Sequence, residues 1–183
     1  MDFDPAKYGP EVARILAMSE NGNRLAPLVH GPCVSEGARR AIAPQKAVEL
    51  FPGTRDPEAA MAGLWLYFSC FEEAHGMVDT PKTSTGEYWH AIVHRQEPDA
   101  GNAAYWFRRV GKHPVFEALA TEAKEILKRY PGAEFRVGQW DPFAFVYFCE
   151  RAQTQPASAQ EQAAREIQRA EWQLLFDYSA RTH

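Results

Sequence analysis

Two histidines one helical turn apart are the side chains in this sequence best placed to do chemistry. His90 and His94 lie in a segment, residues 84–116, that also holds three arginines and two aromatic pairs. Side chains four residues apart on a helix face the same way, so both imidazoles can meet one ion. Near its ordinary pKa an imidazole can also act as a general acid or base at neutral pH. We therefore predict that His90 and His94 bind a divalent metal ion or act catalytically.

A histidine pair needs further ligands from another element, and a catalytic metal site leaves one coordination position open for water. The candidates flank the segment in the sequence: Glu72, Glu73, His75 and His113. We expect His75 to be the third metal ligand. We expect Glu73, or its neighbour Glu72, to orient an imidazole or to act as the base, so the predicted catalytic residues are His90, His94 and Glu73.

The same spacing is also typical of a solvent-exposed helix face. In a helix over residues 85–97, the two histidines fall on the side opposite the apolar residues. Ser84 and Glu87 fit a capping box, which explains the glutamate structurally. The pair also lacks the glutamate of an HExxH motif, which would make a metal site specific. Both interpretations stay open on the sequence alone.

The next predicted helix, from Asp99 to about Val110, carries a second group of polar and aromatic side chains. An amide, a phenol, an indole and a guanidinium share one face, as they would in a pocket for a small polar or anionic ligand. Alternatively, the rings belong to the core and the arginines pair with nearby carboxylates. Arg95 and Arg108, which lie near this face in the sequence, would add positive charge. The predicted ligand-binding residues are Arg95, Asn102, Tyr105, Trp106, Arg108, Arg109 and His113.

The string from Tyr88 to Phe116 resembles the signature of an uncharacterised family of bacterial and eukaryotic proteins. It reads YWHAIVHRQEPDAGNAAYWFRRVGKHPVF. The family pattern is close to YWH-x-x-x-HR-x-E-x-D-x-x-NA-x-YW-x-RRVG-x-HP-x-F. The resemblance covers only these residues and implies no particular reaction. A string so rich in His, Arg, Asn, Tyr and Trp is similar to a site more than to a packing motif.

The elements that would position these side chains are predicted to be helices. Apolar residues recur at helical spacing, prolines and glycines punctuate the segments, and no βαβ alternation occurs. We predict an all-α, single-domain bundle of about five to seven helices. Residues 1–54 form an irregular region of short helices and loops, and residues 55–183 form the helical core. One long helix over 57–75 is expected to carry the third ligand.

Composition excludes several classes of protein. The chain has 183 residues, a net charge of −4 and scattered basic residues, which argues against nucleic-acid binding. We also expect no membrane span. Cys33, Cys70 and Cys149 are widely separated, so we expect reduced, mostly buried thiols in a cytoplasmic protein.

Our leading hypothesis is a small-molecule enzyme, with metal dependence as one option. Its pocket would lie between helices 57–75, 85–97 and 99–110, and its substrate would be a small anionic or polar molecule. The main alternative is a non-catalytic helical module that binds a ligand or a partner helix. Two further alternatives are a carrier of haem or another cofactor and a structural polar network. The sequence does not decide between them.

Overall fold

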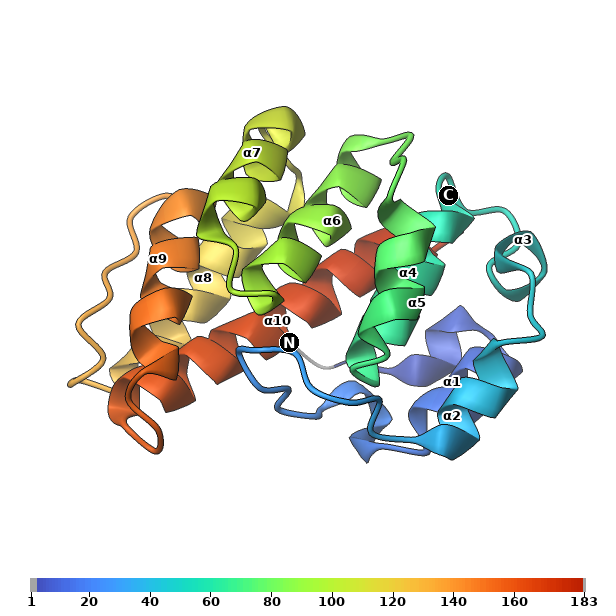
Figure 1. The fold of residues 1–183 in the computed structure, drawn as a ribbon, viewed down its shortest axis with the longest axis horizontal. Helices are drawn as coiled ribbons and strands as arrows, with labels where there is room; N and C mark the ends of the chain where they lie inside the picture. Colours follow the sequence, from blue (N-terminus) through green and yellow to red (C-terminus); the bar gives the residue numbers. More distant parts are fainter. Residues whose placement is uncertain (1–2, 183) are drawn as a thin grey trace.

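The computed structural model describes residues 3–182, which are built from helices and loops and contain no strand (Figure 1). Two short 3-10 turns, η1 (Pro5–Tyr8) and η2 (Glu20–Gly22), lie near the N-terminus. The α-helices are α1 (Pro10–Leu16), α2 (Glu36–Ile42), α3 (Ala47–Leu50), α4 (Pro57–Tyr67), α5 (Phe71–Val78), α6 (Ser84–Gln96), α7 (Ala100–Val110), α8 (Val115–Lys128), α9 (Pro142–Gln153) and α10 (Ala159–Ala180). The all-α prediction is confirmed.

The predicted number of helices is too low, because the described residues contain ten α-helices. Two of the additional helices, α2 and α3, are short and lie in the proline-rich N-terminal region. That region is well packed, since Val12, Ile15 and Ile42 belong to the same hydrophobic cluster as α4. The remaining difference is a break in the predicted helix over 57–75, which is divided into α4 and α5.

The turn between α4 and α5 is closed by local hydrogen bonds and is also held by a distant loop. The Ser69 and Cys70 amides donate to the Leu66 and Trp65 carbonyls at 3.0 and 3.1 Å. Ser69 has a left-handed backbone with φ of 56°, although no glycine or proline marks this position. The Phe68 carbonyl accepts a hydrogen bond from the Val34 backbone amide at 2.8 Å. A disulfide joins Cys33 to Cys70, which caps the start of α5. These contacts come from a loop more than thirty residues away in sequence, so no local pattern could reveal them.

The disulfide also corrects the prediction of three reduced thiols. Cys33 and Cys70 are bonded, and only Cys149 is free among the cysteines. Cysteine usage therefore no longer supports the predicted cytoplasmic location, which stays a prediction. Within residues 3–182, no helix has the length and apolar character that a bilayer crossing requires.

Helix α10 organises the core and fixes the position of α6. It runs behind α4 and α6 in the view of Figure 1. The Trp89 indole of α6 donates a hydrogen bond to Ser179 of α10 at 3.1 Å, and the Trp172 indole donates to the Gly63 carbonyl of α4 at 2.8 Å. A Cβ atom on Gly63 would lie 2.6 Å from the Trp89 ring, so only glycine allows this close approach of α4 to α6.

Side-chain caps start the helices near the site. Asp99 accepts from the Asn102 amide at 2.9 Å and begins α7, as the sequence predicts. Helix α6 differs from the prediction, because Thr83 rather than Ser84 is its N-cap residue. The capping box is therefore wrong, and Glu87 instead forms an ion pair with Arg109 at 2.6 Å.

Candidate metal centre

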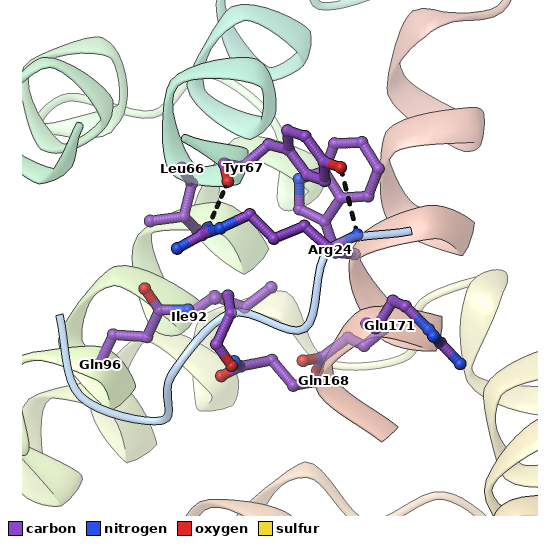
Figure 2. Close-up of a pocket in the computed structure, with 10 residues that line it drawn as sticks. Arg24, Leu66, Tyr67, Ile92, Gln96, Gln168 and Glu171 are labelled. Atoms are coloured by element: carbon purple, nitrogen blue, oxygen red, sulfur yellow. Dashed lines mark hydrogen bonds between the residues drawn. The ribbon is translucent and has the colours of Figure 1, made fainter. Parts of the chain in front are cut away.

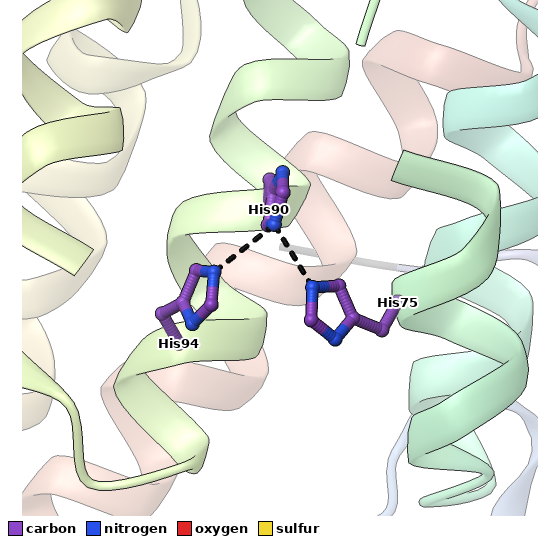
Figure 3. Close-up of side chains that lie close together, drawn as sticks. All are labelled: His75, His90 and His94. Atoms are coloured by element: carbon purple, nitrogen blue, oxygen red, sulfur yellow. Dashed lines mark hydrogen bonds between the residues drawn. The ribbon is translucent and has the colours of Figure 1, made fainter. Parts of the chain in front are cut away.

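Three histidines from two helices converge on one point (Figure 3). His75 comes from α5, and His90 and His94 come from α6. The Nε2 atom of His90 lies 3.1 Å from the Nε2 atom of His75 and 3.0 Å from the Nε2 atom of His94. One ligand atom from each residue lies within 4.8 Å of the other two. These are the three residues that the sequence predicts as metal ligands.

The histidines of α6 are buried, which removes the interpretation of a solvated helix face for this pair. His90 is 3% exposed and His94 is 6% exposed, whereas His75 is half-buried. Helix α6 lies between α5 and α7, so the side of α6 that is opposite its large apolar residues is also covered (Figure 1). Solvent can therefore reach the three histidines from the side of His75, which is the least buried of them.

Two side chains of α7 lie against the faces of the two imidazoles. The Trp106 indole stacks on His90, with ring centroids 4.0 Å apart and an interplanar angle of 22°. The Asn102 side-chain nitrogen lies 3.2 Å from Nε2 and 3.4 Å from Nδ1 of His94. Because these two distances are nearly equal, the amide lies over the ring and does not point at either nitrogen. Asn102 and Trp106 are thus placed to hold the rings of His94 and His90 in position.

Glu97 belongs to the site although it is not among the predicted site residues. Its carboxylate lies 2.8 Å from Nδ1 of His94. An Nδ1–H that donates to the carboxylate leaves the lone pair on Nε2, which faces the other histidines. A carboxylate behind a histidine is the usual second partner of a metal-binding imidazole. The spacing His-x-x-Glu in a helix was visible in the sequence and could have indicated this contact.

The environment of His90 favours its neutral form. Burial is the main cause that lowers the pKa of His90, to about 4, and the neighbouring His94 and His75 rings lower it further. Asp79 and the Val78 carbonyl act in the opposite direction. Even so, the buried Nδ1 atom of His90 has no partner with hydrogen-bond geometry. The lowered pKa favours the neutral imidazole at neutral pH, which is the form that binds a metal ion.

The predicted catalytic carboxylates point elsewhere. Glu73 accepts a hydrogen bond from Arg39 at 2.6 Å, on the side of α5 away from the histidines. Glu72 is exposed. Glu73 and His75 are two residues apart, and side chains at that spacing lie on different faces of a helix. Because α5 is helical, it cannot direct both side chains at one point.

The predicted ligand-binding arginines divide into two groups. Arg95 is buried and forms an ion pair with Glu171 at 2.5 Å, in the core behind α6. Arg108 and Arg109 are exposed on α7, and Arg109 lies over the Trp106 ring with its guanidinium carbon 5.3 Å from the centroid. Tyr105 is 47% exposed. The structure thus brings Arg109 near the stacked rings but not Arg95.

His113 is buried at a distance from the cluster of His75, His90 and His94. The Val115 amide donates to its Nδ1 at 3.4 Å, so its Nε2 carries the proton and donates to the Thr85 hydroxyl at 3.3 Å. Burial lowers the pKa of His113 to about 4. Its role in ligand binding stays a prediction, and its contacts are those of a core residue.

A small cavity lies between α4, α6 and α10, on another side of α6 (Figure 2). Its volume of about 20 Å³ is enough for roughly one water molecule. Gln96, Gln168 and Glu171 line it, and the buried Oε1 atom of Gln168 has no hydrogen-bond partner. Arg24 closes one side by donating to the Tyr67 carbonyl at 2.6 Å. None of the clustered histidines lines this cavity, which differs from the predicted pocket.

Comparison of the chain with models of protein families, with curated proteins and with solved structures finds no match. The chemistry of the site therefore follows from its geometry.

Proposed function

We propose that the chain is a metal-dependent enzyme that acts on a small polar or anionic molecule. His75, His90 and His94 would bind one divalent metal ion, and a fourth position would remain for water or substrate. The observation that carries this proposal is the convergence of three Nε2 atoms from two helices, 3.0–3.1 Å from the central one. A bound metal of this kind supplies an activated water and polarises an oxygen of the substrate.

Hydrogen bonding alone accounts poorly for this arrangement. A neutral imidazole nitrogen carries either one proton or one lone pair. Nε2 of His90 faces two other ring nitrogens, so it cannot form a good hydrogen bond with both of them. An ion at the centre would use all three lone pairs at once. This supports a metal site over a purely structural network of histidines.

The ligand set favours particular metals. Three imidazoles suit zinc, copper, iron, nickel or cobalt, whereas magnesium and calcium prefer oxygen ligands. The residues around the ligands would then have distinct tasks. Glu97 would hold the His94 tautomer, Trp106 and Asn102 would hold the rings, and Arg109 would attract an anionic substrate toward the exposed side.

A non-catalytic metal-binding module is the second candidate. The specific observation in its favour is that Trp106 covers one face of the buried His90 ring, which restricts approach to the metal position. In that case the metal would stabilise the packing of α5, α6 and α7 without turnover.

Metal analysis of the purified protein tests the proposal. We expect one equivalent of a first-row transition metal in the wild type and its loss in His75→Ala, His90→Ala and His94→Ala. His113→Gln is the control, because this histidine lies outside the cluster. Stoichiometric metal that survives all three cluster substitutions would refute the metal site. Turnover of small esters, amides or phosphates by the loaded protein would then separate the enzyme from the binding module.

A further inference from the structure

A short loop joins the two helices that carry the metal ligands. We call residues 30–34 the strap. At one end the His30 backbone amide donates to the Gln96 carbonyl at 2.8 Å, at the last residue of α6. At the other end Cys33 is disulfide-bonded to Cys70, and the Val34 amide donates to the Phe68 carbonyl at 2.8 Å. The strap thus spans from the end of α6 to the start of α5.

Both attachment points are close in sequence to the ligands. Cys70 is the N-cap residue of α5, and His75 lies five residues later on that helix. Between them, Phe71 stacks on the His30 ring at 4.1 Å between centroids and meets the His75 ring edge-on at 6.0 Å. The other attachment point, Gln96, is two residues beyond His94. The strap therefore helps to set the distance between His75 and the histidines of α6.

The disulfide is open to attack from solvent on one side. Cys33 is half-buried, whereas Cys70 is 1% exposed. A hollow of about 500 Å³ lies beside the disulfide, and its wall includes both cysteines, His30 and Arg39. A small thiol can therefore reach Cys33 while Cys70 remains shielded.

We propose that the Cys33–Cys70 disulfide is a redox-modification site whose reduction by a small dithiol weakens metal binding by the three histidines. This inference rests on the proposed metal site. A thiolate of the dithiol attacks Sγ of Cys33, the disulfide breaks, and Cys70 leaves as a thiolate. The second thiol of the reductant then displaces Cys33, which yields the cyclic disulfide of the reductant and two cysteine thiols. Two electrons and two protons pass from the reductant to the protein.

The direction of the effect follows from the size of α5. This helix has eight residues, and a helix so short is not stable without tertiary contacts. Loss of the covalent link at its first turn leaves His75 less well positioned, whereas His90 and His94 stay fixed by the longer α6. A metal that needs all three ligands then binds about tenfold more weakly or worse, as happens when ligand-orienting contacts are removed.

The test compares metal binding by oxidised and reduced protein. Titration with Co²⁺, followed by its visible absorption, gives the affinity of the full chain before and after treatment with a trialkylphosphine, which breaks the bond without adding thiolate ligands. We expect at least about a tenfold loss of affinity on reduction. The double variant Cys33→Ser/Cys70→Ser should bind Co²⁺ as weakly as the reduced wild type, and the phosphine should not change its affinity. Cys149→Ser, which removes the buried free thiol, should respond as the wild type does.

A second measurement separates this inference from the proposed function. Hydrogen exchange of the α5 amides should accelerate on reduction while exchange in α10 stays unchanged. Protein that binds no Co²⁺ in either state refutes the metal site. Protein that binds Co²⁺ equally in both states, with unchanged α5 exchange, overturns the redox inference alone. Alkylation of Cys33 and Cys70 in protein that has not been reduced overturns it as well.

Discussion

Two buried polar clusters lie on different sides of α6, and they differ in how completely their groups are paired. On the core side, Glu171 accepts from two guanidinium nitrogens of Arg95 and from the Tyr88 hydroxyl at 2.9 Å. Only Nε of Arg95 lacks a partner there. On the other side, Nε2 of His90 faces the Nε2 atoms of both His75 and His94, and one ring nitrogen cannot be matched to two others at once. A cluster whose charges and hydrogen bonds are matched stabilises packing, whereas one that needs a further group is a candidate binding site.

The largest expected effect comes from breaking the matched cluster. Glu171→Leu leaves the buried Arg95 charge without compensation, so we expect the free energy of unfolding to fall by about 3–5 kcal/mol in urea titrations. The double variant Arg95→Leu/Glu171→Leu should lose less than the single one, because no charge is stranded. Arg109→Gln, which removes an exposed ion pair, should leave stability nearly unchanged. A Glu171→Leu protein as stable as the wild type would contradict this view of the core cluster.

The unmatched cluster should behave in the opposite way and gain stability from an added ion. With free zinc at about 100 times its dissociation constant, we expect the folded state to gain roughly 3 kcal/mol. Thermal melts of metal-free and zinc-loaded protein measure this gain. His90→Ala should abolish the zinc response, and His113→Gln should keep it because His113 lies outside the cluster. An equal zinc response in wild type and His90→Ala would show that the ion binds elsewhere.

Acid should destabilise the protein through His113. Its folded pKa of about 4 lies below the ordinary value of about 6.5, so the unfolded chain binds the proton first as pH falls. The contribution to stability is complete above pH 6.5 and is lost as the pH drops toward 4. For this group alone we expect a loss of about 2 kcal/mol between pH 7 and pH 5.

Urea titrations at the two pH values, in chelator so that no metal interferes, test this linkage. His113→Gln should lose about 2 kcal/mol less over the interval than the wild type does. His90 contributes a similar slope in both proteins and cancels in the difference. Parallel pH profiles for the two proteins would show that His113 does not titrate as inferred.

The smallest effect concerns the carboxylate that orients His94. Glu97 is partly exposed, so Glu97→Gln should weaken metal binding only about tenfold, at the low end for such contacts, without loss of the metal at saturation. Co²⁺ titration of wild type and variant gives the ratio. Glu73→Gln is the matched control, because Glu73 pairs with Arg39 and not with a histidine, and this variant should bind as the wild type does.

Much of this arrangement was accessible from local sequence signals. The i, i+4 spacing of His90 and His94 already placed both rings on one side of a helix, and Asp99 marked the start of α7 correctly. The sequence could not show that Arg95, which follows His94 directly, turns into the core. That depends on Glu171, which is 76 residues away in the chain.

Sequence by itself determined the all-α class, most helix boundaries and which side chains share a helix face, because these depend on contacts within a few residues. Tertiary structure alone decided that His75 meets the α6 pair, that a disulfide ties the start of α5 to a distant loop, and that Glu73 turns away. Those outcomes depend on the packing of α5 against α6 and on a loop that reaches both, and periodicity within one helix carries no information about its neighbours.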